Sequence, residues 1–173
     1  LSGGGMLAIV WLLQRMEEWE DKGAIVWHDQ TFTYGWLLET QAWWRRRLDT
    51  WGIRPGQVVS IEGDYSPNAC SLLLALIGRG AIVVPLTESV KAHREEFLNI
   101  AETQVAIVFD HADHWQVQYC NGVVKNALTR SLIESHESGL VLFSSGSTGK
   151  PKASLHNMTQ FLLKFHSLRK PLR

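Results

Sequence analysis

The chain has 173 residues, a length typical of one folding unit, and 45% of them are hydrophobic while 20% are charged. This composition excludes a disordered or fibrous protein. Seventeen basic residues balance seventeen acidic ones, so the charge favours neither nucleic acid nor an anionic membrane as a partner.

Three features of the sequence bear on domain organisation and location. Residues 1–5 (LSGGG) are interpreted as a remnant of an expression tag or a disordered lead, and residues 6–173 are expected to form a single α/β domain. No apolar run approaches the roughly 18 residues that span a bilayer. Cys70 and Cys120 belong to no CxxC pair, which argues against a zinc site or a disulfide framework and predicts a cytoplasmic location.

The first third of the chain predicts two helices and a hairpin. Residues 6–22 carry apolar side chains at helical spacing and end before a glycine. Residues 24–34 are two β-prone runs joined at Asp29-Gln30, which predicts a small hairpin. Residues 35–52 predict a second amphipathic helix that ends at a glycine.

From residue 57 onwards, short apolar strands alternate with helices. The strands are expected at residues 57–63, 81–86, 104–110 and 139–145, and the helices at 66–80, 89–102, 128–135 and 156–169. A short strand pair is expected around residues 117–125. This alternation predicts an α/β fold with a mostly parallel sheet of about four to five strands, helices on both faces and a small N-terminal β-hairpin. Right-handed crossovers would place the carboxyl ends of the parallel strands along one rim, where open α/β sheets bind ligands.

The segment that follows the last apolar strand has the composition of a phosphate-binding loop. Its two glycines allow positive φ and close approach of the backbone to an anion, its hydroxyl groups can donate hydrogen bonds, and its two lysines add positive charge. The candidate phosphate-binding residues are Ser144, Ser145, Gly146, Ser147, Thr148, Gly149, Lys150 and Lys152. The alternative is a plain Gly/Ser turn between two elements.

A Walker A loop is excluded for this segment. That motif has the pattern GxxxxGK[ST]. Aligned on Gly149 and Lys150, it needs a glycine at position 144 and a serine or threonine at position 151. Ser144 occupies the first of these positions and Pro151 the second, so a P-loop NTPase is not expected.

Residues 142–157 (LFSSGSTGKPKASLHN) closely resemble the phosphate-loop signature of the adenylate-forming superfamily. This superfamily contains AMP-dependent acyl-CoA synthetases, adenylation domains of nonribosomal peptide synthetases, and luciferases. Residues 31–39 (TFTYGWLLE) and 72–89 (LLLALIGRGAIVVPLTES) are similar to two further motifs in the expected order. The resemblance covers about residues 24–165, and Ala153 departs from it where the family usually has glycine.

The resemblance implies that the chain is the N-terminal portion of an ATP-dependent, AMP-forming carboxylic acid–thiol ligase of the acyl-CoA synthetase type. Its substrates would be ATP with Mg²⁺, a small-molecule carboxylate, and a thiol of coenzyme A or of a carrier protein's phosphopantetheine. The loop would grip the β- and γ-phosphates and the departing pyrophosphate, while His156 would lie near the acyl pocket. Fatty, aromatic and amino acids all remain open as the carboxylate.

The same resemblance implies that the catalytic residues, including the Mg²⁺ ligand, lie beyond residue 173. The fragment is therefore predicted to be inactive alone, and surfaces normally covered by the rest of the enzyme would favour its self-association. The alternative is a non-catalytic nucleotide- or partner-binding module that retains only the phosphate loop.

Two other polar clusters have plainer interpretations. Residues 110–115 (DHADHW) have a composition that suits metal ions, but a polar loop after a strand is the favoured reading because no further ligand can be identified. Glu62 and Asp64 could form a general acid–base pair, although turn and cap roles explain them more simply. No metal site is predicted.

Overall fold

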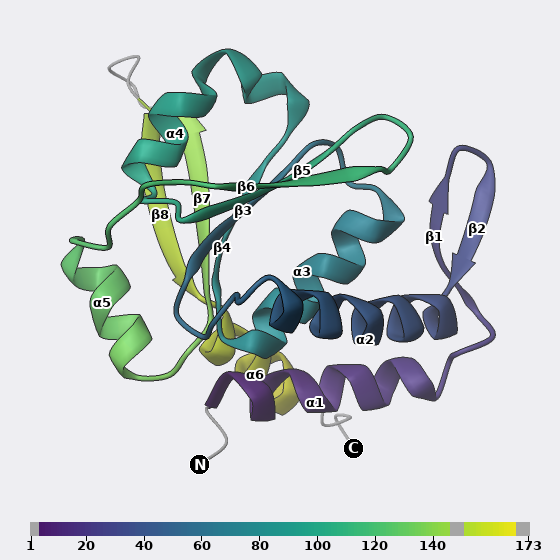
Figure 1. Cartoon of the computed structure of the whole chain (residues 1–173). Helices are drawn as coiled ribbons and strands as arrows, with labels where there is room; N and C mark the ends of the chain where they lie inside the picture. The colour runs from purple at the N-terminus through teal and green to yellow at the C-terminus, as the bar shows by residue number, and fades with distance from the viewer. Residues whose placement is uncertain (1–3, 146–150, 169–173) are drawn as a thin grey trace.

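A six-stranded sheet organises the chain (Figure 1). The structure is a computed structural model and describes residues 4–145 and 151–168. In chain order its elements are α1 (Gly4–Glu17), β1 (Gly23–Trp27), β2 (Gln30–Thr33), α2 (Tyr34–Thr50), β3 (Val58–Glu62), α3 (Pro67–Arg79), β4 (Ile82–Leu86), the 3₁₀ helix η1 (Glu88–His93), α4 (Arg94–Ile100), β5 (Val105–Phe109), β6 (Trp115–Tyr119), α5 (Ala127–Glu134), β7 (Gly139–Ser145), β8 (Pro151–Asn157) and α6 (Met158–Leu168). None of the helices in these two ranges is long and apolar enough to cross a membrane.

The strand order is β6-β5-β3-β4-β7-β8. The four inner strands are parallel, while β6 and β8 pair antiparallel with β5 and β7 at the two edges. The predicted α/β fold, with its mostly parallel sheet and small N-terminal hairpin, is confirmed. The edge strands differ from the prediction, because β6 pairs with β5 rather than forming a local pair over residues 117–125, and β8 was not predicted at all.

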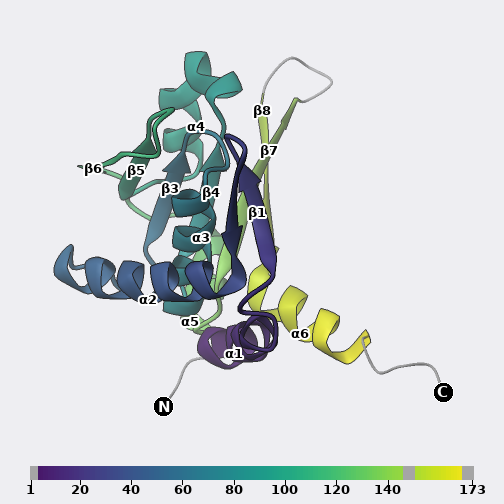
Figure 2. The ribbon, with the colours of Figure 1, turned by 90° about the vertical axis from the view of Figure 1, so that its right-hand side faces the viewer.

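Each face of the sheet carries its own apolar core, because successive side chains of a strand point to opposite faces. Val59 and Ile61 of β3 lie in the larger core with α1, α2, α3 and α6. Val58 lies in the smaller core with α4, and α5 packs against its margin. Figures 1 and 2 show α1 and α2 lying side by side across one end of the sheet, where they contact each other.

Local sequence signals explain where several elements begin and end. The Ser66 hydroxyl accepts a hydrogen bond from Ala69 N at 3.2 Å, which caps α3. Gly80 ends the same helix in the left-handed conformation, with φ of 77°. The β1–β2 turn lies at His28-Asp29, where both residues have positive φ as a two-residue hairpin turn requires. The turn is thus one residue earlier than the predicted Asp29-Gln30, and the expected helix over residues 89–102 is divided into η1 and α4.

Candidate functional site

The predicted phosphate loop lies at the tip of the β7–β8 hairpin. The hairpin's ladder runs from Gly139, opposite Asn157, to Ser145, opposite Pro151. Of the predicted phosphate-binding residues, Ser144 and Ser145 end β7 and Lys152 lies near the start of β8. The remaining five, Gly146, Ser147, Thr148, Gly149 and Lys150, lie outside the described residues.

Two of the predicted residues face each other across the hairpin. Ser144 and Lys152 are Cα partners in the antiparallel ladder, and both are exposed. A hydroxyl donor and an ammonium group are therefore presented on neighbouring strands at the mouth of the loop. Because β7 runs parallel to β4, this mouth lies at the rim formed by the carboxyl ends of the inner strands, as the sequence predicted.

The hairpin is held at both ends by packing and hydrogen bonds. Near the tip, the Phe143 ring stacks on Phe97 of α4, with ring centroids 4.2 Å apart and planes 4° apart. At the base, Asn157 Nδ2 donates to a Glu137 carboxylate oxygen at 2.6 Å. The two strands are therefore positioned independently of the residues that join them.

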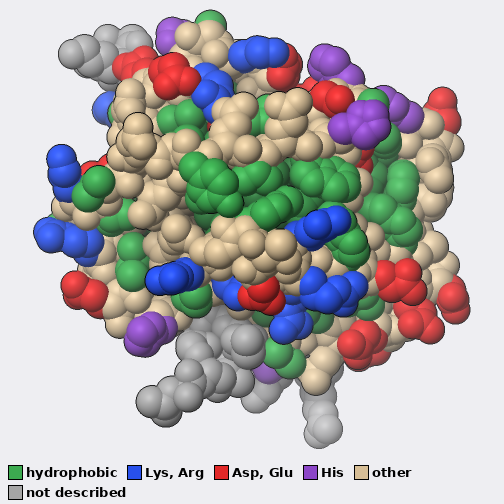
Figure 3. Space-filling view, in the orientation of Figure 1, with side chains coloured by type: hydrophobic (Ala, Val, Ile, Leu, Met, Phe, Trp, Pro, Cys, Tyr) green, Lys and Arg blue, Asp and Glu red, His purple; other side chains and the backbone are tan. Residues whose placement is uncertain are grey.

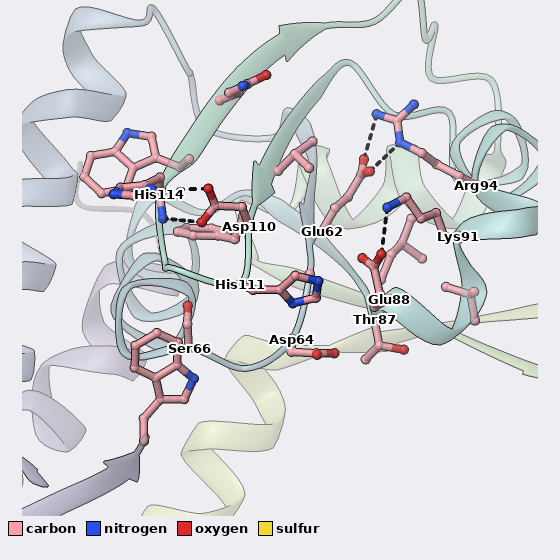
Figure 4. Close-up of a pocket in the computed structure, with 18 of the residues that line it drawn as sticks. Glu62, Asp64, Ser66, Thr87, Glu88, Lys91, Arg94, Asp110, His111 and His114 are labelled. Carbon is pink, nitrogen blue, oxygen red and sulfur yellow. Dashed lines mark hydrogen bonds and ion pairs between the residues drawn. The ribbon is translucent and has the colours of Figure 1, made fainter. Parts of the chain in front are cut away.

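Beside the hairpin, the same rim contains a pocket of about 410 Å³ lined by both charged and apolar side chains (Figure 4). Its walls are the ends of β3, β4 and β5, the start of β6 and the β1–β2 turn. Strand β3 leads into α3 on one face of the sheet, whereas β4 leads into η1 and α4 on the other face. The pocket therefore lies at a point where adjacent connections leave in opposite directions, which is where open α/β sheets commonly bind ligands.

The charged groups of this pocket are mostly paired with one another. Arg94 donates to both carboxylate oxygens of Glu62, through Nε to one and through a terminal nitrogen to the other at 3.1 Å. These hydrogen bonds raise the pKa of the Arg94 guanidinium above its usual value. Lys91 lies 2.7 Å from a Glu88 oxygen, and that hydrogen bond lowers the pKa of the exposed Glu88 carboxyl. Figure 4 shows both pairs, one above the other, on the α4 side of the pocket.

Glu62 has a structural role rather than that of an acid–base catalyst. It is buried at the end of β3 and also accepts a hydrogen bond from the Ser60 hydroxyl at 2.8 Å. With Arg94 on both carboxylate oxygens, no lone carboxyl is left to transfer a proton. Asp64 lines the pocket further along, and its backbone oxygen accepts from Ser66 N. The predicted turn role therefore fits Asp64, whereas Glu62 ends β3 and forms an ion pair that the sequence analysis did not predict.

The DHADHW segment is a loop that is held by hydrogen bonds among its own residues. Asp110 accepts hydrogen bonds from the backbone N–H of His114 and Ala112, each at 2.9 Å, and the bond from His114 is the main reason that the pKa of Asp110 is lowered. Asp113 accepts from Asn68 N at 3.1 Å and so caps the start of α3. Across residues 4–145 and 151–168, no three His, Cys, Asp or Glu side chains are placed to hold a metal ion.

His156 lies far along β8 from the loop. It is exposed and pairs with Leu140, five ladder positions from the Ser145–Pro151 pair. At about 3.4 Å per residue, this separation is roughly 17 Å. A place near an acyl pocket stays a prediction for this residue.

Sequence reasoning missed the residues that support the site. Arg94 and Phe97 lie in a segment that was expected to be an ordinary amphipathic helix, and Phe143 was treated only as part of an apolar run. Their partners are 32 and 46 residues away in sequence. The sequence REEF at residues 94–97 contains no motif that could have revealed these contacts.

Comparison with known proteins agrees with this arrangement. The family model described as AMP-binding enzyme matches residues 12–169. Among curated proteins, bacitracin synthase 3 of Bacillus licheniformis is 27% identical over 157 residues, and gramicidin S synthase 2 of Aneurinibacillus migulanus is 26% identical over 155. These alignments cover 82% and 80% of this chain but 2% and 3% of the two relatives, so the chain spans a small part of their length.

Solved structures show the same fold. The N-terminal subdomain of NpsA from Klebsiella oxytoca is 25% identical with a TM-score of 0.65, and the match covers 84% of this chain and 41% of that one. VinN in complex with L-aspartate has a TM-score of 0.70 over 95% of this chain and 52% of its own, at 19% identity, which supports the fold alone. Because the family model covers most of its length, this chain belongs to the AMP-binding enzyme family, as the N-terminal part of an adenylate-forming enzyme.

Proposed function

We propose that this chain is the N-terminal part of an adenylation enzyme that activates a carboxylic acid with ATP and delivers it to the thiol of a carrier protein. The observation that carries the proposal is the hairpin geometry, in which Ser144 and Lys152 flank the loop at the carboxyl rim of the sheet. In this proposal the loop from Ser144 to Lys152 holds the β- and γ-phosphates and stabilises the pyrophosphate as it leaves.

The relatives favour a carrier protein over coenzyme A as the acceptor. The curated relatives are named for the synthesis of bacitracin and gramicidin S, and one similar structure is an artificially fused NpsA–ThdA adenylation–PCP di-domain. NpsA has also been solved with 3-hydroxybenzoyl and anthranilyl AMSN compounds. We therefore propose an amino acid or an aromatic acid as the substrate, in place of the fatty acids that the acyl-CoA synthetase interpretation included.

The Mg²⁺ that such a reaction uses receives no ligand assignment within the described ranges, because they contain no suitable group of acidic and histidine side chains. The contribution of this chain is to bind phosphate and to orient it. Lys152 supplies positive charge and Ser144 a hydroxyl donor, and neither group needs to exchange a proton during the reaction. The cytoplasmic location stays a prediction, consistent with two free cysteines.

Pyrophosphate binding by the chain tests the phosphate site directly. Titration calorimetry with pyrophosphate, and then with ATP, should give saturable binding. Lys152→Ala should weaken that binding about ten- to hundredfold, which is the effect of losing a charged hydrogen bond of about 1.5–3 kcal/mol. Lys125→Ala is the matched control, because Lys125 is exposed on the connection that leaves β6 beside the start of β5, away from the carboxyl rim. Equal loss in both variants, or no binding by the intact chain, would refute the phosphate role.

A transfer assay with a longer protein that contains this chain tests the acceptor. Acyl-adenylate formed in place should load a carrier protein bearing phosphopantetheine faster than it acylates free coenzyme A. Faster acylation of coenzyme A would return the proposal to the acyl-CoA synthetase class. An enzyme that binds pyrophosphate but catalyses no ATP–pyrophosphate exchange with any acid would support the non-catalytic module.

A further inference from the structure

An aromatic groove runs between α2 and β6, on the edge of the sheet opposite the phosphate loop. Helix α2 presents one line of residues at helical spacing that is neither its buried face nor its fully exposed face. Strand β6 presents alternate residues of one face beside it. We call this surface the α2–β6 groove; its residues are Trp36, Trp43, Trp51, Trp115, Val117 and Tyr119.

Helix α2 and strand β6 contact each other at two points that are equally far apart on both elements. The Trp43 and Trp115 rings meet edge to face with centroids 5.4 Å apart, and the Tyr119 hydroxyl donates to the Trp51 backbone oxygen at 3.1 Å. Between these contacts the helix advances eight residues, or about 12 Å, while the strand advances four residues, or about 13 Å. The matched lengths keep the aromatic side chains of α2 and β6 in contact along this surface, and a hollow is present only at its Trp36–Trp43 end.

Nothing in the described part of the chain covers this groove. Strand β6 is the last strand of the sheet, so its outer backbone groups pair with no other described strand. The tryptophans are half-buried, and Tyr119 is 68% exposed. Figure 3 shows a continuous band of hydrophobic side chains across the face that carries β6 and α2. Contiguous exposed apolar surface next to a free strand edge is typical of an interaction site.

Two arginines lie at the rim of the groove. Arg46 lines the hollow at one end and Arg47 lies over the Trp43 ring; both are exposed and form no ion pair within the described residues, whereas Arg45 points to another side of α2 because successive helix residues are about 100° apart. The Arg47 guanidinium lies 4.8 Å from the centre of the Trp43 ring, in a cation–π contact that leaves its outer side free. Figure 3 shows Lys and Arg side chains gathered along one side of the hydrophobic band. Because the whole chain has no net charge, this local excess selects for an acidic partner.

One end of the groove contains a shallow, open hollow. The hollow has a volume of about 350 Å³, and its lining includes Trp36, Trp43, Trp115 and Arg46, with Glu39 as its acidic member. Tryptophan and arginine are the residue types enriched in protein–protein hot spots. A bulky apolar side chain can enter the hollow while neighbouring carboxylates reach the arginines.

We propose that the α2–β6 groove binds an acidic segment of a partner protein, anchored by one apolar side chain in the hollow beside Trp43. A second copy of this chain is a poor occupant, because a two-fold contact through this surface would bring Arg46 and Arg47 of each copy together. The phosphate loop is four strand spacings away, or roughly 19 Å, so a partner in the groove leaves that loop accessible.

Fluorescence anisotropy with designed peptides tests the proposal. The probe is a labelled peptide of about 12 residues in which leucines recur every three or four residues and glutamates occupy the positions between them. A second peptide has lysine in place of every glutamate. The acidic peptide should bind the intact chain with a Kd below about 100 µM and weaken as salt rises, whereas the lysine peptide should not bind.

Variants separate the charge from the hollow. Arg46→Glu combined with Arg47→Glu should weaken the acidic peptide at least about tenfold, and Thr40→Phe, which fills the hollow, should also weaken it. Arg130→Glu on α5 is the matched control, because Arg130 is exposed and lies away from the groove. Circular dichroism checks that each variant keeps its helices.

Three results would overturn the proposal. The first is no binding of the acidic peptide by the intact chain at about 1 mM. The second is equal binding of the lysine peptide, or binding of the acidic peptide that the double Arg variant does not weaken. The third is self-association of the intact chain in light scattering that the double Arg variant abolishes, since a second copy would then be the occupant.

Discussion

The stacked pair of Phe97 and Phe143 allows the support of the phosphate loop to be measured. Phe97 is 7% exposed in the smaller core, and Phe143 directly precedes the first predicted phosphate residue. Truncation to alanine would cost about 3–5 kcal/mol, a large part of a typical 5–15 kcal/mol stability. Leucine is the better perturbation, because it keeps most of the volume and costs less than about 1.5 kcal/mol.

A double-mutant cycle isolates the contact between the two rings. Phe97→Leu, Phe143→Leu and the double variant would be unfolded in urea, and the free energies of unfolding compared. A parallel stack with centroids at 4.2 Å should give a coupling of about 0.5–1.5 kcal/mol beyond the area buried. The control cycle uses Phe161 and Phe165, which are exposed on α6 with ring centroids 4.7 Å apart. For that pair we expect only about 0.2–0.5 kcal/mol.

The functional consequence follows from the position of Phe143. If the stack fixes the end of β7, Phe97→Leu should weaken pyrophosphate binding, while Phe161→Leu should leave it unchanged. A coupling no larger than that of the control pair would refute the reasoning about the stack. A normal coupling with unchanged pyrophosphate affinity would show that the stack stabilises the core without positioning the loop.

Three further predictions concern the rim and the thiols. Gly63→Ala should destabilise the chain by about 1–3 kcal/mol in urea unfolding, because Gly63 has φ of 121° and an added Cβ would lie 2.9 Å from a backbone oxygen of β5; an unchanged midpoint would contradict this. Ser66→Ala should cost about 1 kcal/mol by removing the cap of α3, and Ser66→Asp should restore it. The pKa of the Cys70 thiol is raised mainly by burial and secondly by the nearby Asp113 carboxylate. Its thiolate fraction at pH 8 is therefore small, and its labelling by a thiol reagent should still accelerate above pH 9. Asp113→Asn should lower that pKa and speed labelling, with Cys120 as the internal reference; an unchanged Cys70 rate would reject the electrostatic cause.

The inner part of the fold could be predicted because its strands are buried on both faces. Strands β4 and β5 are uninterrupted apolar runs, β3 is apolar except for Ser60 and Glu62, and the Ser66-Pro67 entry to α3 is a recognisable helix start. Strand β8 could not be predicted, since PKASLHN has mostly exposed side chains and begins with a proline. Its pairing with β7 comes from the hairpin connection rather than from its own pattern.

The candidate site was predictable in composition but not in geometry. The residue types from Ser144 to Lys152 favour phosphate chemistry over a plain Gly/Ser turn, which stays a prediction, and the sequence does not show that Ser144 and Lys152 are opposite each other in a ladder. Nor can the pairing of Glu62 with Arg94 be predicted from sequence, because it depends on α4 crossing back over β3. A polar residue inside an apolar strand indicates only that some partner must exist.

The same constraint explains why both proposed binding surfaces lie at the edges of this sheet. A buried position of an inner strand cannot carry a polar side chain without a partner inside the protein, and Glu62, held by Arg94, is an example. Ser144 is exposed because β7 pairs with β4 only at Gly139 and Leu140, so the end of β7 has β8 as its partner. At the edges the requirement is relaxed. Lys152 is exposed near the start of β8, and Tyr119 is exposed at the end of β6. The inner strands therefore serve as a fixed frame, and phosphate recognition at one edge can coexist with partner recognition at the other.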